Sequence, residues 1–504
     1  MKRAVIVVLG ASLFLGGAFA QSAKPCESLK LFSLANVTIT AAEAVPAGPF
    51  QVQSPVPGGP PPPPVTLPTY CRIAAVLTPS ADSHIEMELW MPTADWNGKF
   101  EAVGNGGFMG AISYSAMTAA LREGYATAAS DTGHKGGSAS FALGHPERRI
   151  DFAYRAVHEM TVKSKALIAA YYGRQARLAY WNGCSTGGRQ GLKAAQRFPE
   201  DFDAIVAGAP ANYETHLHAW TVALAMNVIK DDKNILPAST YPILNQAVLA
   251  ACDAQDGVKD GLLNDPRQCH FDSSTLLCSG SGAANCLTAE QVEAVKKIYA
   301  PLRTRSGELI FPSLEPGSEL AWGLQVGGNA PNSIGQDTFM YLTYGDPKWD
   351  WHTFDVDRDT AAADKKDDGM IDAIDPDLLQ FKARGGKLLM YHGWNDTGIA
   401  PENSINYYSS VLKKMGAKQD GWFRLFMAPG MQHCGGGPGP NQANWMGALE
   451  RWRESGTAPD MVIASHVTGG TVDMSRPLCP YPQVAVYKGA GSTNDAASFS
   501  CKTP

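Results

Sequence analysis

The chain has 504 residues, of which 44% are hydrophobic and 18% are charged, and its formal net charge is −6. This composition is that of an ordinary globular protein, long enough for one large catalytic domain with a sizeable insertion. The slight negative charge excludes a basic surface for nucleic acid and a polybasic membrane anchor. We therefore expect a small, roughly neutral molecule as the binding partner, with no nucleic acid and no membrane.

The N-terminus has the features of a secretory signal. Lys2 and Arg3 precede an apolar run that ends in Ala18-Phe19-Ala20. A short positive region, an apolar core and a small-x-small pattern are typical of a cleaved signal peptide. A transmembrane anchor is the alternative, but the run is too short, is rich in Gly and Ala, and lacks a charged stop beyond it. We expect cleavage after Ala20 and a secreted or periplasmic mature protein.

The cysteines support the same compartment. The chain has 10 of them, and no two form a Cys-x-x-Cys pair, so a zinc ribbon is not expected. An even number in an oxidising compartment is typical of a disulfide framework. We interpret all ten cysteines as disulfide-bonded.

Strand and helix patterns alternate over the first part of the chain. Strands are predicted at 71–77, 84–91, 99–103, 126–130, 178–182 and 202–207, and helices at 154–172 and 185–198. The alternation stops near residue 211 and resumes with a strand at 387–391, a helix at 401–415 and a strand at 423–427. Strands that alternate with helices indicate β-α units and an α/β sheet.

The region without alternation separates two parts of this sheet. It is rich in Asn, Asp, Pro, Gly, Cys and aromatic residues, and we predict that residues 211–374 form an inserted lid domain over the site. After a signal peptide at 1–20, residues 21–210 and 375–504 would then form one catalytic α/β domain. The acidic stretch 355–377 is expected to be a solvated linker.

A candidate nucleophile lies between a predicted strand and a predicted helix. The segment Gly183-Cys184-Ser185-Thr186-Gly187 fits the pattern Gly-x-Ser-x-Gly. In a nucleophile elbow, a tight strand-to-helix turn exposes the serine and requires small residues on both sides. The start of the helix also directs free N–H groups at developing negative charge. This context favours Ser185 as the nucleophile over a plain Gly-Ser loop.

A serine nucleophile needs a histidine base and an acid that orients it. In α/β-hydrolases these follow the serine in the order Asp or Glu, then His, on loops after late strands. Among the 11 histidines, His433 follows a predicted strand and a turn in a glycine-rich loop, and Asp396 follows the strand at 387–391. His392 precedes this acid and is interpreted as a packed residue. The predicted triad is Ser185, Asp396 and His433.

Two cysteines lie directly beside this predicted triad. Cys184 precedes Ser185, and Cys434 follows His433. A bond between these two thiols would hold the nucleophile and the base together. Since small displacements of a catalytic base cost large factors in rate, its effect on position would matter more than its effect on stability.

Several motifs carry a resemblance to a known family. They are Gly183-Cys184-Ser185-Thr186-Gly187-Gly188-Arg189, Tyr391-His392-Gly393-Trp394-Asn395-Asp396, Pro429-Gly430-Met431-Gln432-His433-Cys434 and the tail Arg476-Pro477-Leu478-Cys479-Pro480-Tyr481-Pro482. With these motifs the chain resembles the tannase/feruloyl esterase family, a lidded branch of the α/β-hydrolases. The resemblance implies the same triad and the pairs Cys184–Cys434, Cys26–Cys71, Cys252–Cys269, Cys278–Cys286 and Cys479–Cys501.

An acidic loop lies inside the predicted lid. Its carboxylates at short spacing, with glycines between them, suit a hard cation, although the spacing is not that of an EF-hand. The residues alone leave a solvated acidic turn equally open. The resemblance implies a structural Ca²⁺ bound by the side chains of Asp253, Asp256 and Asp260 and by the carbonyls of Val258 and Leu262.

An oxyanion hole needs two N–H donors. One is expected from Thr186, directly after the nucleophile, and one from an early glycine loop. We assign the second to Gly106 in the segment Gly104-Asn105-Gly106-Gly107, with Gly107 next to it.

The resemblance also implies the substrate class, which is esters of aromatic acids of the gallic or hydroxycinnamic type. A related branch hydrolyses mono(2-hydroxyethyl) terephthalate and binds its carboxylate with a lid arginine. The corresponding stretch 333–351 has no arginine and only Lys348 as a cation, which favours a neutral aromatic acyl group. Its aromatic residues are interpreted as lid core; they are Phe339, Tyr341, Tyr344, Trp349 and Trp351.

Three alternatives remain open from the sequence. The chain is alternatively a hydrolase of terephthalate-type half-esters, a peptidase on the same scaffold, or a non-catalytic protein that binds polyphenols or carbohydrates. An intact triad argues against the non-catalytic alternative.

Overall fold

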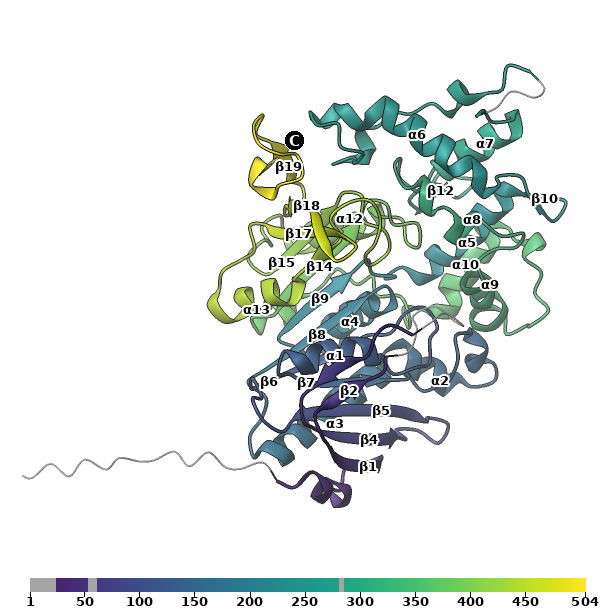
Figure 1. Cartoon of the computed structure of the whole chain (residues 1–504). Coiled ribbons are helices and arrows are strands. Elements are labelled where there is room, and N and C mark those ends of the chain that lie inside the picture. Colours follow the sequence, from purple (N-terminus) through teal and green to yellow (C-terminus); the bar gives the residue numbers. More distant parts are fainter. Residues whose placement is uncertain (1–23, 53–60, 281–284) are drawn as a thin grey trace, which may run out of the picture.

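The computed structural model describes residues 24–52, 61–280 and 285–504 (Figure 1). The predicted signal peptide and its cleavage site therefore lie outside the described residues. Within them, the largest sheet has nine strands in the order β1-β4-β5-β7-β6-β8-β9-β14-β15. In chain order these strands are β1 (Val37–Val45), β4 (Tyr70–Leu77), β5 (Ile85–Pro92), β6 (Lys99–Val103), β7 (Ala126–Ser130), β8 (Leu178–Cys184), β9 (Ala204–Gly208), β14 (Lys387–Gly393) and β15 (Phe423–Ala428).

The sheet has an antiparallel part and a parallel part. The pairs β1–β4, β4–β5 and β5–β7 are antiparallel. All pairs from β7 through β6, β8, β9 and β14 to β15 are parallel. The expectation of an α/β fold is confirmed. The sheet also has an antiparallel edge, whose strands follow one another in sequence without a helix between them. In the parallel part, the loops after β6, β8, β14 and β15 leave the sheet at the same edge, which is where α/β proteins place their sites.

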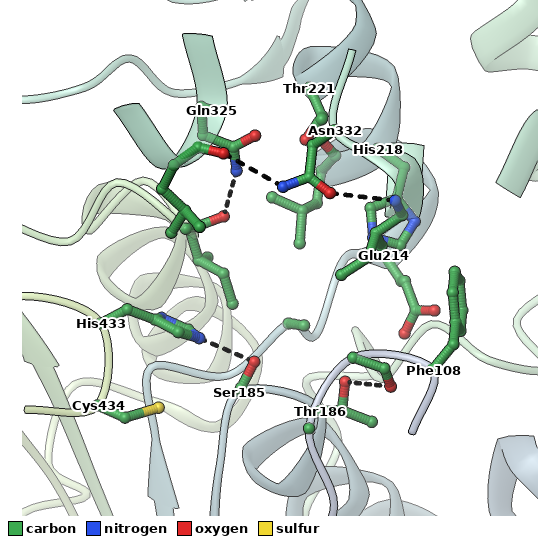
Figure 2. Close-up of a pocket in the computed structure, with 18 of the residues that line it drawn as sticks. Phe108, Ser185, Thr186, Glu214, His218, Thr221, Gln325, Asn332, His433 and Cys434 are labelled. Carbon is green, nitrogen blue, oxygen red and sulfur yellow. Dashed lines mark hydrogen bonds between the residues drawn. The ribbon is translucent and has the colours of Figure 1, made fainter. Parts of the chain in front are cut away.

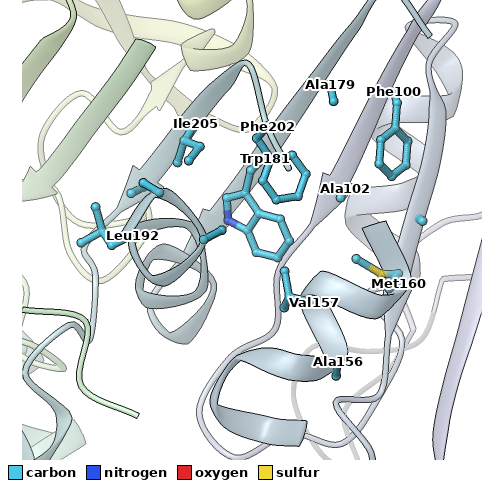
Figure 3. Packing of buried hydrophobic residues seen from close by; sticks show 14 of the residues in the cluster. Phe100, Ala102, Ala156, Val157, Met160, Ala179, Trp181, Leu192, Phe202 and Ile205 are labelled. Atoms are coloured by element: carbon cyan, nitrogen blue, oxygen red, sulfur yellow. The ribbon is translucent and has the colours of Figure 1, made fainter. Parts of the chain in front are cut away.

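Helices cover both faces of this sheet. Side chains alternate along β8. Ala179 and Trp181 therefore pack on one face of the sheet (Figure 3), whereas Leu178 and Tyr180 pack on the other. The first face is covered by α3 (Ala156–Tyr172), α4 (Thr186–Arg197) and α12 (Glu402–Met415), and the second by α1 (Tyr114–Arg122) and α13 (Trp445–Ser455). Burial on both faces explains why the parallel strands are apolar throughout.

The residues from 211 to 374, here called the inserted region, are mainly helical and lie together to one side of the sheet (Figure 1). Their helices are α5 (Glu214–Val228), α6 (Tyr241–Cys252), α7 (Ala289–Ile298), α8 (Gly323–Val326), α9 (Ser333–Asp337) and α10 (Val356–Asp367). Buried aromatic residues, among them Trp220, Phe311 and Trp322, form a second core between these helices. The inserted region thus has packing of its own, apart from the core of the sheet.

Smaller elements complete the described chain. They are α2 (Pro146–Ile150), α11 (Leu379–Ala383), and the paired strands β2 (Gly48–Phe50) with β3 (Val65–Leu67), β10 (Ile229–Lys230) with β11 (Lys233–Asn234), β12 (Leu302–Arg303) with β13 (Leu309–Phe311), β16 (Gln442–Ala443) with β17 (Val462–Thr468) and β18 (Thr471–Leu478), and β19 (Val484–Tyr487) with β20 (Phe499–Lys502). No helix of the described segments combines the length and the apolar character needed to cross a bilayer.

The prediction of a solvated linker at 355–377 is wrong. Its first half is helix α10, and the side chains of Asp359, Asp367 and Asp372 are buried. Asp367 accepts hydrogen bonds from the N–H groups of Ile371 and Asp372. The acidic composition predicts that these carboxylates are solvated. In the structure they are buried and accept hydrogen bonds from backbone N–H groups, as buried charges require.

All ten cysteines form disulfides, in the five pairs that the resemblance implies. These are Cys26–Cys71, Cys184–Cys434, Cys252–Cys269, Cys278–Cys286 and Cys479–Cys501. The prediction of a complete disulfide framework is confirmed. Such a framework is typical of proteins that fold in an oxidising compartment.

Candidate active site

Ser185 occupies a sharp turn between β8 and α4. Its backbone has φ 63° and ψ −126°, a conformation that residues other than glycine rarely adopt. The turn also brings Gly183 against Gly187: a Cβ atom on Gly183 would lie 2.5 Å from the carbonyl carbon of Gly187. The structure thus contains the tight strand-to-helix turn that the pentapeptide predicts, and it requires glycine at this position.

The structure brings the three predicted triad residues together. His433, in the loop after β15, has its Nε2 atom 2.9 Å from Ser185 Oγ (Figure 2). Its Nδ1 atom lies 2.7 Å from Oδ2 of Asp396, in the loop after β14. A continuous hydrogen-bonded path therefore runs from the serine hydroxyl to the carboxylate, as proton transfer by a serine hydrolase requires.

Asp396 is completely buried, and both of its oxygens are hydrogen-bonded. Oδ1 accepts from the N–H groups of Gly398 and Ile399, at 2.7 and 3.0 Å. Oδ2 lies 3.0 Å from His392 Nε2 in addition to its contact with His433. Burial alone would raise the pKa of Asp396, but the two histidines outweigh it and hold this pKa well below its ordinary value. The carboxylate therefore stays ionised beside His433.

His392 has the packed role that the sequence predicts. It is fully buried at the end of β14, and its Nδ1 atom lies 2.7 Å from Ser404 Oγ on α12. The ring is thereby fixed between α12 and Asp396. The ring contacts the acid and forms no hydrogen bond with Ser185, which agrees with the packed role expected from the sequence.

The pKa of His433 depends on two opposing effects. Burial lowers the pKa of this half-buried ring, while the charge of Asp396 and its hydrogen bond raise it. The net effect places the pKa of His433 above its ordinary value. A base with a pKa near neutrality can both accept the serine proton and return it to a leaving group.

The Cys184–Cys434 disulfide joins the two residues that are adjacent in sequence to Ser185 and His433. It spans 250 residues of sequence, and its Cα atoms are 5.9 Å apart. Both cysteines also line the cavity in front of the serine, and Figure 2 shows Cys434 below His433. The covalent bond therefore joins the two loops that carry Ser185 and His433.

The two residues predicted to supply the oxyanion donors line the same cavity as the serine. Thr186 is the first residue of α4, so its N–H is not used within the helix. Its hydroxyl donates a hydrogen bond to the carbonyl of Gly107 at 3.0 Å, which ties the loop after β6 to the elbow. Both Gly106 and Gly107 line the cavity, and we find no acceptor for their N–H groups in the described parts of the chain.

The cavity in front of Ser185 has a volume of about 400 Å³. The elbow, the loop after β6 and the histidine loop form one side. The inserted region forms the other side with residues from α5 to α9 (Figure 2). The lining residues from the inserted region are Ala211, Glu214, Leu217, His218, Thr221, Leu324, Gln325, Asn332 and Ile334. A volume of this size suits a small organic molecule.

Sequence reasoning missed most of the inserted side of this cavity. Four lining residues of α5 follow helical spacing, at positions 214, 217, 218 and 221. No sequence motif singles out Glu214, and His218 is one of the histidines that the expected placement of the base after a late strand excludes. The available signal was that α5 begins directly after β9, at the edge of the sheet where the serine lies. Only the phase of the helix decides which residues face inward.

The aromatic residues of the stretch 333–351 do not line the cavity. Phe339 is fully buried and stacks on Trp349, as the lid-core interpretation predicts. Tyr344 is 41% exposed and belongs to neither the core nor the cavity. Within the described segments, no Arg or Lys lines the cavity.

Two ionisable groups of the inserted side are buried. Burial raises the pKa of Glu214 to about 7, although Arg189 opposes this effect from 2.9 Å away. Burial, assisted by the charge of Arg189, lowers the pKa of His218 to about 3. The imidazole of His218 is therefore neutral at any ordinary pH.

The predicted calcium loop is compact and is tied to the C-terminal segment. Asp253 accepts hydrogen bonds from the N–H groups of Asp260 and Gly261, and Asp256 accepts from that of Val258. Asp260 forms an ion pair with Arg476 at 2.5 Å. In the described residues, no three His, Cys, Asp or Glu side chains converge closely enough to hold a metal ion.

The donor chemistry of the loop nevertheless suits calcium. The loop carries the carboxylates of Asp253, Asp256 and Asp260 against the two cations Lys259 and Arg476, so negative charge is in excess, and Asp253 is buried. Carboxylates and backbone carbonyls in a short loop with glycines are the ligands that Ca²⁺ prefers. The Cys252–Cys269 disulfide closes the loop at its base.

Together, the sheet, the elbow and the loops after β14 and β15 define an α/β-hydrolase. The family model described as tannase and feruloyl esterase matches residues 71–502. The chain belongs to this family and is accordingly a carboxylic ester hydrolase.

Relatives and solved structures agree with this assignment. The chain is 36% identical to an uncharacterized esterase of Xanthomonas campestris, covering 96% of this chain and 92% of the relative. It is also 36% identical to a probable feruloyl esterase B-2 of Aspergillus terreus, covering 86% of each. The crystal structure of feruloyl esterase B from Aspergillus oryzae superposes with a TM-score of 0.89 at 33% identity, covering 95% of this chain and 99% of that one.

Proposed function

We propose that the protein is a secreted serine esterase that hydrolyses esters of aromatic acids, of the hydroxycinnamic or gallic type, through an acyl-enzyme on Ser185. The observation that carries this proposal is the chain of contacts Ser185 Oγ–His433 Nε2 at 2.9 Å and His433 Nδ1–Asp396 Oδ2 at 2.7 Å, at the base of the cavity. The names of the relatives supply the aromatic class of the acid.

Acylation begins with His433. Its Nε2 atom takes the proton of Ser185 as the oxygen attacks the ester carbonyl, and Asp396 stabilises the imidazolium that forms. The negative charge that develops on the carbonyl oxygen is met by the N–H groups of Thr186 and Gly106. The tetrahedral intermediate then collapses, and the alcohol leaves with the proton from His433.

Deacylation repeats these steps with water. His433 accepts a proton from a water molecule that attacks the acyl-enzyme, and the same N–H groups stabilise the second oxyanion. Breakdown of this intermediate returns the proton to Ser185 and releases the aromatic acid. The disulfide between Cys184 and Cys434 keeps the base in range of the serine through both halves of the cycle.

The charges around the cavity favour a neutral acyl group over a terephthalate half-ester. The inserted side carries Glu214 and has no Arg or Lys among its described residues, so it offers no cation to a free carboxylate. A panel of methyl ferulate, methyl gallate and mono(2-hydroxyethyl) terephthalate tests this directly. We expect turnover of at least one of the first two, with kcat/KM for the half-ester lower by tenfold or more. A half-ester hydrolysed fastest would overturn the proposed acyl specificity.

Covalent labelling separates an esterase from a non-catalytic binding protein. An aryl organophosphonate should modify Ser185 stoichiometrically, and the Ser185→Ala variant should stay unmodified. A protein that remains unlabelled under these conditions is not a serine hydrolase. Casein added to the substrate panel tests a peptidase, and faster cleavage of casein than of any ester would favour that activity.

We also propose a structural Ca²⁺ at the side chains of Asp253, Asp256 and Asp260 and the carbonyls of Val258 and Leu262. The excess of negative charge in this disulfide-closed loop supports it. The ion would add rigidity between the inserted region and the C-terminal segment, with no part in the chemistry. Export through a signal peptide cleaved after Ala20 completes the proposal, and N-terminal sequencing of the mature protein tests it.

A further inference from the structure

One turn of α5 presents two polar side chains to the cavity from the side opposite His433. Glu214 and His218 are four residues apart, so they are neighbours on one face of the helix. In Figure 2 both lie beside Phe108, across the cavity from His433, with Ser185 between the two sides. The ring of Phe108 meets that of His218 edge-on, with centroids 5.7 Å apart. Neither polar group takes part in the proposed proton transfers.

The contacts behind His218 indicate which of its nitrogens carries the proton. Thr338 Oγ1 lies 3.1 Å from the carbonyl oxygen of Ile334 four residues earlier, the acceptor that a threonine inside a helix commonly uses, and we assign the hydroxyl proton to this contact. The same Oγ1 lies 2.6 Å from His218 Nδ1. Because its single proton is already used, the hydroxyl accepts from Nδ1–H. The neutral ring therefore has a bare lone pair on Nε2.

This lone pair is open to the cavity. His218 lines the cavity, and no residue in the described segments bonds to its Nε2. Glu214 Oε2 is buried and faces the guanidinium of Arg189 at 2.9 Å, so it is not open to a ligand. The other oxygen, Oε1, is not fully enclosed and receives no hydrogen bond from the described residues. When Glu214 is ionised, the wall therefore offers two acceptors, His218 Nε2 and Glu214 Oε1. Buried acceptors without a donor cost free energy until a ligand supplies one.

We propose that His218 Nε2 and the Glu214 carboxylate form the site that accepts hydrogen bonds from the ring hydroxyl groups of the acyl moiety. The inference rests on the proposed function, which it deepens: the preferred substrates carry a free phenolic O–H, and vicinal hydroxyls engage both acceptors. A phenol is a good donor, whereas an unsubstituted or fully methylated ring offers these acceptors nothing. Phe108 borders the same part of the cavity and would contact the ring itself.

Titration does not remove the acceptor on His218. Burial and Arg189 together hold the pKa of this ring at about 3, so Nε2 stays unprotonated across the assay range. The contribution of His218 to the preference for hydroxylated rings should therefore persist from acidic to alkaline pH. The contribution of Glu214 as an acceptor should grow as pH rises through its pKa of about 7.

The test is a ratio of two substrates that differ only in the hydroxyl group. We would measure kcat/KM for methyl p-coumarate and for methyl cinnamate, and report their quotient. The wild-type quotient should exceed about ten, because sites built to bond a hydroxyl group discriminate strongly against its absence. His218→Leu should lower the quotient by about tenfold. Thr338→Val keeps the shape of the threonine, removes the anchor of Nδ1, and should lower the quotient by a smaller factor.

His216→Leu is the matched control. His216 is two residues away on the same helix and is buried, but it bonds Ile310 and Asp364 and does not line the cavity. Loss of helix packing would slow both esters in any of these variants without changing the quotient. A quotient that falls in His218→Leu and Thr338→Val, and not in His216→Leu, supports the proposal.

Three results would overturn the inference: no wild-type preference for the hydroxylated ester, an unchanged quotient in His218→Leu, or an equal fall in His216→Leu. A wild-type enzyme that hydrolyses neither ester, nor methyl gallate, would instead remove the proposed function itself. The two failures are thus distinguishable in one experiment.

Discussion

The two sides of the cavity satisfy their polar groups in opposite ways. On the side of the sheet, both oxygens of Asp396 are bonded within the protein, and a disulfide joins the loops of Ser185 and His433. On the inserted side, Nε2 of His218 is left without a donor among the described residues. The bonds on the sheet side hold the reacting atoms in place. The open acceptor on the inserted side is available for a hydrogen bond from the substrate. Changes on the sheet side should alter the rate for every ester, and changes on the inserted side should alter which ester is preferred.

The largest effect is expected at the nucleophile. Ser185→Ala should lower kcat by roughly 10⁴- to 10⁶-fold for every ester, because the acyl-enzyme cannot form. Steady-state kinetics with methyl ferulate would measure this. Ser410→Ala is a matched control, since Ser410 lies on α12 and its hydroxyl bonds only the backbone of Tyr407. A Ser185→Ala enzyme that keeps a tenth of the wild-type rate would exclude Ser185 from the mechanism.

The disulfide between Cys184 and Cys434 should affect rate and stability separately. The double variant Cys184→Ala/Cys434→Ala removes a disulfide that closes a loop of 250 residues. On the chain-entropy model, this lowers the free energy of unfolding by up to about 5 kcal/mol. We expect kcat to fall by roughly 10- to 100-fold at temperatures where the variant is still folded, because the base is displaced.

Cys479→Ala with Cys501→Ala is the control for this pair, since that disulfide joins C-terminal residues that do not line the cavity. It should lower the melting temperature and leave kcat nearly unchanged. If both double variants lose activity only as they unfold, the Cys184–Cys434 bond has no role in positioning the base.

For esters without ring hydroxyl groups, the pH dependence of kcat/KM should be set by the sheet side alone. His433 acts as a base only when neutral, so kcat/KM should fall about tenfold for each pH unit below its pKa. Asp396 raises this pKa, which places the acid limb above the ordinary value for histidine of about 6.5. The limb should be the same for all esters without ring hydroxyl groups, which do not engage Glu214, and unchanged in His218→Leu. An acid limb that moves between such esters or with His218 would contradict the separation of the two sides.

Chelation should have the smallest effect on chemistry. Removing Ca²⁺ with EDTA should lower the melting temperature by several degrees, because a ligand bound only to the folded state stabilises it. The rate at 25 °C should change less than twofold, since the acidic loop does not line the cavity. Asp256→Asn should lower the melting temperature in the same way and make it insensitive to EDTA. An unchanged melting temperature after chelation would count against the ion.

The sequence by itself determined the fold class, the elbow and the order of the triad residues. These depend on short-range patterns: the apolar strand of β8, the glycines that the turn requires at 183 and 187, and the loops that follow β14 and β15. The five disulfide pairs followed from the resemblance, because spacing alone does not give connectivity.

Only the tertiary structure decided the inserted side of the cavity. It shows that α10 replaces the expected linker, that Phe339 belongs to a core, and that Glu214 and His218 face Ser185. The physical reason is that the regular hydrogen bonds between strands of a parallel sheet fix the positions of neighbouring strands. The position of a helical insertion depends instead on irregular side-chain packing. The phase of α5, and with it the chemistry offered to the substrate, depends on contacts between residues more than 100 positions apart, such as His218 with Thr338.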